Sequence, residues 1–465
     1  KRIWYRNRPP YRQADQSPSV DYTALPPFSR GDGGIPTTDV YQDPWLFQVV
    51  FDYGEHGTDD ARLDGGNWEN LTPADLFDDT PAPIENRTWP MRPDAFSTYR
   101  AGFEVRTQRL CRRVLMFHRM DETGTIGADW HLVRSTDFGY DKNSVATYLV
   151  AAKQTGYVRT DDGYTRRWMP PLEMRYDRPK FDTTIQVVDP ESLENLPIGL
   201  DGRQYQWVDL DSEGISGILT EQGTGWFYKR NLGGAEFGPA ELVATKPSVA
   251  VLQSPQQRVM DLAGDGTQDI VLLGDLTGYY QREAEGEWRN FQSFESTPTV
   301  DWNDPNLRFI DLNGDGHADI LITQDELFVW YPSQARQGFG AAETVRKAQD
   351  EEQGPALVFA DGTQSVYLAD MSGDGLNDLV RIRNGEVCYW PSLGYGRFGA
   401  RVTMARAAWF DHPELFDQKR VRLADIDGSG TTDILYLGRE EIAIWLNQAG
   451  NSFQQYGTQP GERRI

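Results

Sequence analysis

The stretch from Asp311 to Asp319 constrains the fold more than any other part of this chain. Its acidic and amide side chains occupy positions one, three, five and nine, and glycines occupy positions four and six. Glycine adopts the positive φ angles that a tight loop requires. Short apolar runs lie on both sides, as in the two strands of a hairpin. The stretch therefore predicts a β-hairpin with an acidic tip.

Four further segments repeat this outline. They begin at Asp209, Asp261, Asp370 and Asp425, so that successive first aspartates are 52, 50, 59 and 55 residues apart. Each acidic loop is followed by an aromatic strand and then by a glycine-containing turn. A period of this length accommodates four short strands and is typical of β-propellers. We therefore expect each repeat to form one four-stranded blade.

The repeats predict an all-β propeller with six four-stranded blades. Residues 201–465 would supply five blades, and residues 41–200 would supply an irregular blade with insertions, because β patterns continue there without an acidic loop. A seven-bladed ring is the alternative. Residues 1–40 are rich in proline, arginine and glycine and predict an extended surface segment or a linker. A strand near residues 45–53, or the strand after Phe453, would close the ring.

Charge and hydropathy narrow the classes of partner. The chain has 70 acidic and 46 basic residues, for a formal net charge of -24. Such a charge repels phosphate backbones and anionic lipids, so we expect no binding to nucleic acid. Without an apolar run of about 18 residues, we also expect no direct membrane insertion. The start at Lys1 without a signal-peptide pattern suggests a segment of a longer protein.

The loop at 311 offers oxygen ligands for calcium. Calcium takes six to eight hard oxygen ligands, and a compact loop can supply them from positions one, three, five, seven and nine. The predicted ligands are Asp311, Asn313, Asp315, the carbonyl group of His317, and Asp319. Calcium is therefore the one cofactor that the sequence suggests.

The other loops match this ligand set less well. Ala263 removes the third ligand of its loop, Ser372 and Ser429 place hydroxyl groups where carboxylate or amide groups are expected, and Gly217 lacks the ninth side chain. The alternative is that the aspartates accept hydrogen bonds from their own loop amides and hold the hairpin without an ion. The sequence leaves both alternatives open.

Tryptophans divide into two groups. Trp330, Trp390 and Trp445 recur at one place in the repeat, which indicates core positions between blades. Trp68 and Trp89 lie outside the repeats, so the fold does not require them, and we predict that they contact a partner.

Enzyme motifs are missing from the sequence. The five histidines show no metal-ligand spacing, and there is no Gly-x-Ser-x-Gly, His-Glu-x-x-His or phosphate-binding glycine loop. The sequence therefore predicts a protein that is not an enzyme and has no catalytic residues.

Several longer strings resemble a known family. The acidic loops and the Phe-Gly turns are similar to the FG-GAP or VCBS repeats of integrin-like propellers. The segments Val50–His56, Ser97–Thr107, Leu110–His118 and Tyr389–Gly399 resemble the B component (TcB) of bacterial insecticidal toxin complexes, after its SpvB-like start. The resemblance runs from about residue 45 to the end.

The resemblance implies a function in docking and gating. In that family the B and C components form a cocoon around a toxic domain. A β-propeller of B closes the cocoon and docks onto the funnel of the pentameric A component, a channel, so that the toxic domain can be translocated. The implied partners are the A component and, through the rest of the B chain, the C component, within a larger secreted toxin. The alternative is an integrin-like, calcium-dependent adhesion or glycan-binding propeller.

Overall fold

The computed structural model describes fourteen stretches of the chain. They are residues 2–5, 47–53, 91–118, 131–160, 163–177, 187–196, 205–243, 246–247, 249–252, 254, 256–283, 286–360, 365–439 and 441–460. The chain divides into two compact units, which are described separately below. Unit 1 comprises Lys1–Ala95 and Thr107–Arg178, and unit 2 comprises Phe96–Arg106 and Pro179–Ile465.

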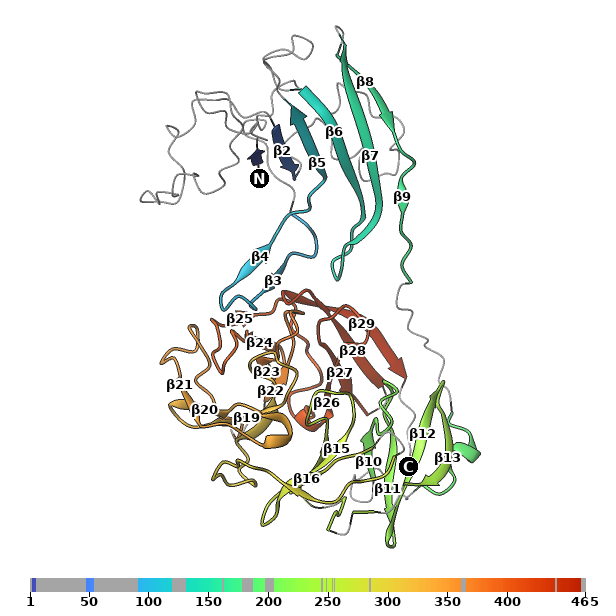
Figure 1. Cartoon of the computed structure of the whole chain (residues 1–465), viewed down its shortest axis with the longest axis vertical. Coiled ribbons are helices and arrows are strands. Elements are labelled where there is room, and N and C mark those ends of the chain that lie inside the picture. Colours follow the sequence, from blue (N-terminus) through green and yellow to red (C-terminus); the bar gives the residue numbers. More distant parts are fainter. Residues whose placement is uncertain are drawn as a thin grey trace, which may run out of the picture. The chain divides into compact units, whose positions relative to one another are not determined.

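Unit 1 is built on a seven-stranded antiparallel sheet. Its strand order is β1-β2-β5-β6-β7-β8, and β9 pairs with β7 (Figure 1). Buried and partly buried residues alternate along β5, because successive side chains of a strand point to opposite faces. The strands are β1 (Arg2–Tyr5), β2 (Phe47–Asp52), β5 (Arg113–His118), β6 (His131–Asp141), β7 (Tyr148–Thr160), β8 (Gly163–Trp168) and β9 (Leu172–Glu173).

This sheet differs from the irregular four-stranded blade that the sequence predicts for residues 41–200. Its central strands β6 and β7 have 11 and 13 residues, and they continue one sheet of seven strands instead of a short blade. The expected clasp at residues 45–53 is also wrong. That segment contains β2, whose two edges pair with β1 and β5 inside unit 1. The sequence of residues 41–200 lacks the acidic loop that accompanies each blade elsewhere in the chain.

Unit 2 contains five four-stranded antiparallel sheets in sequence order, as the repeats predict. Figure 1 shows them following one another from green to red. Blade 1 is β10 (Tyr205–Val208), β11 (Gly217–Gln222), β12 (Gly225–Gly233) and β13 (Glu236–Leu242). Blade 2 is β14 (Gln257–Met260), β15 (Asp269–Leu273), β16 (Thr277–Tyr280) and β17 (Gln292–Ser293).

The remaining sheets have the same order. Blade 3 is β18 (Leu307–Ile310), β19 (Asp319–Thr323), β20 (Leu327–Tyr331) and β21 (Glu343–Arg346). Blade 4 is β22 (Val366–Ala369), β23 (Asp378–Arg383), β24 (Glu386–Trp390) and β25 (Val402–Thr403). Blade 5 is β26 (Val421–Ala424), β27 (Asp433–Leu437), β28 (Glu441–Gln448) and β29 (Ser452–Pro460).

The unit is an all-β propeller, and the predicted acidic loops join its first and second strands. In each blade the first strand ends just before the loop, and the ninth loop position is the first residue of the second strand. The described residues form five blades, so the count of six stays a prediction. The strand after Phe453, proposed as a clasp, is β29, which pairs with β28 of its own blade.

Apolar clusters lie between neighbouring blades. Four clusters join blades 1 and 2, 2 and 3, 3 and 4, and 4 and 5. Trp330, Trp390 and Trp445 are buried in the last two, which confirms that the recurring tryptophans are core residues. Within the described part of the chain, no helix has the length and apolar character needed to cross a membrane.

A short hairpin completes unit 2. It consists of β3 (Phe96–Thr98) and β4 (Val105–Thr107), which pair only with each other. In sequence it interrupts unit 1, yet residues 96–106 belong to the propeller unit. The helix α2 (Pro190–Leu193) precedes blade 1 and is capped by Asp189, whose carboxylate accepts the amide hydrogen of Ser192.

Candidate functional site on the acidic-loop face

The five acidic loops form a continuous row on one face of the propeller. Each loop joins the first and second strands of its blade, and each approaches the loop of the next blade. The neighbouring residues are Ser212 with Gly266, Gly264 with His317, Gly314 with Leu376, and Gly373 with Thr431. This row is the surface on which the predicted functional residues of the repeats lie.

The first aspartate of each loop closes the loop through backbone amides. Asp311 accepts hydrogen bonds from Gly314 N at 2.7 Å and Gly316 N at 2.9 Å. The glycine at position six has a φ angle between 82° and 88° in all five loops, which residues with a β-carbon rarely adopt. The equivalent pairs are Asp209 with Gly214, Asp261 with Gly266, Asp370 with Gly375, and Asp425 with Gly430. The loop shape therefore depends on this carboxylate and this glycine.

A fully buried aspartate occupies the ninth position in four of the five loops. Asp319 accepts hydrogen bonds from Leu312 N at 3.0 Å and Ser333 N at 2.7 Å. It thereby ties the acidic loop to the loop that follows the third strand. Its counterparts are Asp269, Asp378 and Asp433.

Burial controls the protonation of these aspartates. It raises the pKa of Asp269, Asp319 and Asp433 to about 6 and the pKa of Asp378 well above its usual value. Backbone hydrogen bonds lower each pKa but do not outweigh the removal of the carboxylate from water. These residues therefore serve first as structural ties.

Blade 1 has no ninth aspartate, and a tyrosine replaces it. A β-carbon on Gly217 would lie 2.5 Å from the hydroxyl oxygen of Tyr228. This hydroxyl group accepts the amide hydrogen of Leu210 at 3.3 Å and donates to the carbonyl group of Val208 at 3.2 Å. Leu210 has the loop position of Leu312, which bonds Asp319 in blade 3. In blade 1 the hydroxyl group of Tyr228 therefore accepts the hydrogen bond that the ninth-position aspartate accepts in blade 3.

Four side chains that the sequence predicts as calcium ligands in the loop at 311 take part in hydrogen bonds. Asn313 Nδ2 donates to Asp315 Oδ2 at 2.8 Å, and Asn313 Oδ1 accepts the amide hydrogen of Asp315 at 2.9 Å. Asp315 Oδ1 accepts the amide hydrogen of His317 at 2.8 Å. Asp311 likewise accepts hydrogen bonds from amides of its own loop, and Asp319 accepts them from Leu312 and from Ser333 after the third strand. Calcium at this loop remains a prediction.

The loop from Asp425 to Asp433 brings carboxylates together more closely. Within the described stretches, oxygens of Asp425, Asp427 and Asp433 lie within 4.8 Å of one another, which makes them a possible metal site. Three carboxylates suit calcium, which prefers hard oxygen ligands. The three carboxylates of this loop therefore fit the ion by their proximity, although all three also accept backbone hydrogen bonds.

The β3–β4 hairpin packs on the acidic loop of blade 4 and on the turn between β28 and β29 of blade 5. The amide of Tyr99 donates to Asp374 Oδ2 at 2.6 Å, and the guanidinium group of Arg100 donates to the Asp374 carbonyl group. Arg106 Nη2 donates to Asn451 Oδ1 at 2.7 Å. Asp374 stands at position five of its loop, a position that can supply a calcium ligand, and its carboxylate binds the hairpin.

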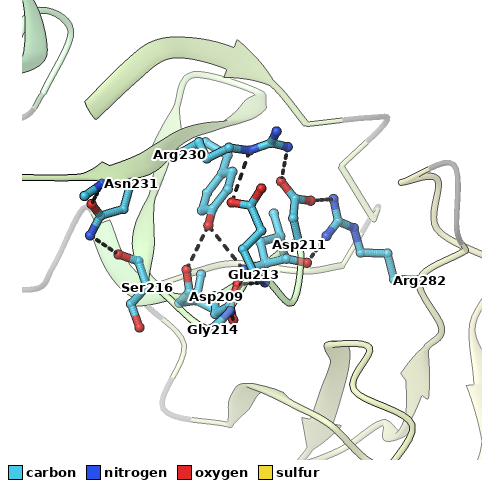
Figure 2. A network of polar contacts seen from close by, with 12 residues as sticks. Asp209, Asp211, Glu213, Gly214, Ser216, Arg230, Asn231 and Arg282 are labelled. Atoms are coloured by element: carbon cyan, nitrogen blue, oxygen red, sulfur yellow. Dashed lines mark hydrogen bonds and ion pairs between the residues drawn. The ribbon is translucent and has the colours of Figure 1, made fainter. Parts of the chain in front are cut away.

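A charged cleft opens between blades 1 and 2 at the same face. It has a volume of about 810 Å³. Figure 2 shows Asp211 held between Arg230 of blade 1 and Arg282 of blade 2, at oxygen–nitrogen distances of 2.6 and 2.8 Å. Although burial opposes ionisation, the hydrogen bonds from the two arginines hold the pKa of Asp211 below its usual value. Asp211 therefore connects the two blades as a carboxylate.

Sequence reasoning missed this network and the hairpin contact. Asp211 was recognised only as part of the loop outline, because no local pattern pairs it with an arginine 71 positions later. The predicted partner-binding residues Trp68 and Trp89 lie outside the described residues. Their partner contacts remain a prediction.

Two family models match parts of the chain. The model described as Salmonella virulence plasmid 65 kDa B protein (SpvB) matches residues 5–120, and the FG-GAP-like repeat model matches residues 261–322. The mono(ADP-ribosyl)transferase SpvB of Salmonella typhimurium is 40% identical over 123 residues, which are 26% of this chain and 17% of that protein. The shared segment is thus a small part of the Salmonella protein.

Solved structures match most of the chain. A chain in the Tc holotoxin pore of Photorhabdus luminescens matches 92% of this chain with a TM-score of 0.72 and 28% identity. A chain of the TcdB2–TccC3 complex matches 92% with a TM-score of 0.53 and 28% identity. This chain covers 19% and 20% of those chains, respectively. It is a TcB-like region that combines an SpvB-like segment with FG-GAP-like repeats, as the sequence resemblance indicated.

Proposed function

We propose that this TcB-like chain is the docking and gating propeller of a Tc toxin B component. In this role it closes the cocoon of the B and C components and binds the funnel of the pentameric A component, so that the toxic domain can be translocated. The observation that carries the proposal is the 28% identity, over 92% of the chain, to a chain of the Photorhabdus luminescens Tc holotoxin pore. In this role the chain has no catalytic activity and acts outside the producing bacterium.

A propeller is physically suited to this role. Its blades are separate four-stranded sheets, and neighbouring blades in the described residues are joined by side-chain clusters and a few polar contacts rather than by one continuous sheet. A protein interface of standard size buries about 1,200 to 2,000 Å². The free energy of such an interface is large compared with that of a few hydrogen bonds or ion pairs between two neighbouring blades. Docking can therefore drive the propeller from a closed to an open arrangement.

Binding to a purified pentameric A component tests the proposal. The chain is immobilised, and its affinity is measured by interferometry with calcium and again with a chelator. We expect nanomolar binding in both buffers, and the same affinity for Asp427→Ala, which alters the calcium-like loop of blade 5. The C component alone serves as the negative control, because it is expected to contact the rest of the B chain. Absence of binding to the A component in either buffer would refute the docking role.

A calcium-dependent adhesion or glycan-binding propeller is the second candidate. The three carboxylates of Asp425, Asp427 and Asp433 favour it, because they form a set of oxygen ligands. Under this candidate, both ligand affinity and stability would fall in chelator and in Asp427→Ala. The same two measurements therefore separate the two functions.

A further inference from the structure

We infer that the propeller opens between blades 1 and 2, and that Asp211 is the latch that holds this seam closed. The inference rests on the proposed gating role and names the place where the gate opens. A seam is defined here as the contact between two neighbouring blades.

Backbone hydrogen bonds cross the other three seams between successive blades of the described residues. Thr432 N donates to Asp370 O at 2.9 Å between the loops of blades 5 and 4, and Tyr395 N donates to Leu312 O at 2.6 Å between blades 4 and 3. Between blades 2 and 3, the segment after β17 forms a parallel bridge from Ser296 to Gly338. Such bonds involve the main chain, so a change of side chain or of pH does not remove them.

Side chains make the corresponding connections at the seam of blades 1 and 2. Arg282 reaches from blade 2 to Asp211 and to the carbonyl group of Leu210, and Ser212 donates to the carbonyl group of Gly266. Within the described residues of these two blades, no backbone-to-backbone bond joins them. The acidic-loop end of this seam is thus held by a few side chains around an open cleft.

Like charges face each other across the cleft. Blade 1 contributes Asp211, Glu213 and Glu241 to its lining, and blade 2 contributes Asp265, Glu283 and Glu287. The lining contains two arginines, Arg230 and Arg282, and both bind Asp211 (Figure 2). Within the described residues, Asp211 and Arg282 form the ion pair that crosses this cleft, so removing the carboxylate leaves Arg282 only the carbonyl group of Leu210 on blade 1. Asp211 therefore supplies the electrostatic attraction that opposes the repulsion between the acidic groups of the two blades.

The seam of blades 4 and 5 differs, because main-chain bonds and an additional hairpin hold it together. Their acidic loops are joined directly, and the β3–β4 hairpin bridges the two blades by contacting Asp374 in the loop of blade 4 and Asn451 in the β28–β29 turn of blade 5. An apolar cluster that includes Trp226 and Ile270 does connect blades 1 and 2. Opening therefore begins at the cleft, where Asp211 lies, and proceeds toward this cluster.

Hydrogen exchange of the isolated chain tests the latch without any partner. In the wild-type chain, we expect amides of β10 and of the segment 209–216 to exchange faster than their counterparts at 370–377. Asp211→Asn, which keeps the shape of the side chain, should accelerate exchange in blades 1 and 2 about tenfold to a hundredfold, as expected for losing hydrogen bonds to charged groups. Arg282→Met should have the same effect.

The matched control is Arg381→Met in blade 4, where Arg381 binds Glu351 at 2.9 Å, away from the cleft of blades 1 and 2. It should leave exchange at residues 209–216 unchanged. Equal protection of all wild-type seams, or no effect of Asp211→Asn and Arg282→Met, would overturn the latch.

Binding to the A component separates this inference from the proposed function. Latch variants that exchange faster and bind the A component more tightly support both, because an open propeller then needs less binding energy to form. Faster exchange in a chain that does not bind the A component supports the weak seam and refutes docking. Binding with unchanged exchange supports docking and refutes Asp211 as the latch.

Discussion

The hydroxyl group of Tyr228 lies where a side chain on Gly217 would have to stand. A β-carbon at Gly217 would approach this oxygen to 2.5 Å, and the oxygen accepts the amide hydrogen of Leu210 at 3.3 Å. In blade 3 the corresponding amide binds Asp319. The glycine that breaks the acidic pattern in blade 1 is thus explained by a tyrosine eleven residues later.

Removal of this hydroxyl group should destabilise blade 1. Tyr228→Phe leaves the amide of Leu210 buried without its acceptor, which costs about 1 to 3 kcal/mol. The free energy of unfolding is measured by urea denaturation. Tyr280→Phe is the control, since Tyr280 is buried in the same cluster and its hydroxyl group makes no hydrogen bond to the described residues. Equal losses for both variants would contradict the assigned role.

The buried ninth-position aspartates should make stability depend on pH in an unusual direction. The pKa of Asp269 is raised to about 6 by burial, above its usual value of 3.8. The folded state therefore holds a proton that the unfolded state releases, so stability is highest below about pH 4 for this group and is lost as the pH rises through about 6. Its contribution is on the order of 2 kcal/mol.

Urea denaturation between pH 4 and pH 7 checks this dependence. Asp269→Asn should flatten the decrease in the free energy of unfolding over that range. Asp189→Asn should not, because hydrogen bonds from Ser192 hold the pKa of Asp189 below its usual value, outside the range. A wild-type stability that rises from pH 4 to pH 7 by an amount that Asp269→Asn abolishes would show that the sign is wrong.

Repetition made much of the fold predictable. The loop outline and its period give the five four-stranded blades, and Asp311 with Gly316 gives the loop closure, because these features depend on residues near each other in the chain. The partners of Asp211 and Asp374 could not be predicted. Arg282 and Tyr99 lie 71 and 275 positions away from them, and only the folded chain brings them together. For the same reason the long strands β6 and β7 were mistaken for part of a blade.

Calcium should act at the loop of blade 5 if it acts at all. In saturating calcium at about 100 times the dissociation constant, a single site adds about 2.7 kcal/mol to the free energy of unfolding. We expect Asp427→Ala to abolish this gain, because Asp427 lies within 4.8 Å of the other two carboxylates. Asp315→Ala, in the loop at 311, should retain it. The reverse result, measured by denaturation with calcium and with chelator, would place the ion at the loop that the sequence indicated.

The hairpin contact with Asp374 can be isolated with a matched pair of variants. Asp374 and Asp315 occupy position five of their loops, and each accepts the amide hydrogen of the residue two positions on, Leu376 or His317. Asp374 alone of the two also binds Tyr99, so the difference between Asp374→Ala and Asp315→Ala measures the hairpin contact. Loss of this charged hydrogen bond should release residues 96–106 and accelerate tryptic cleavage after Arg100 and Arg106 about tenfold. Asp315→Ala should leave cleavage there unchanged. Equal cleavage in both variants would mean that Arg106 and Asn451, rather than Asp374, hold the hairpin on the propeller.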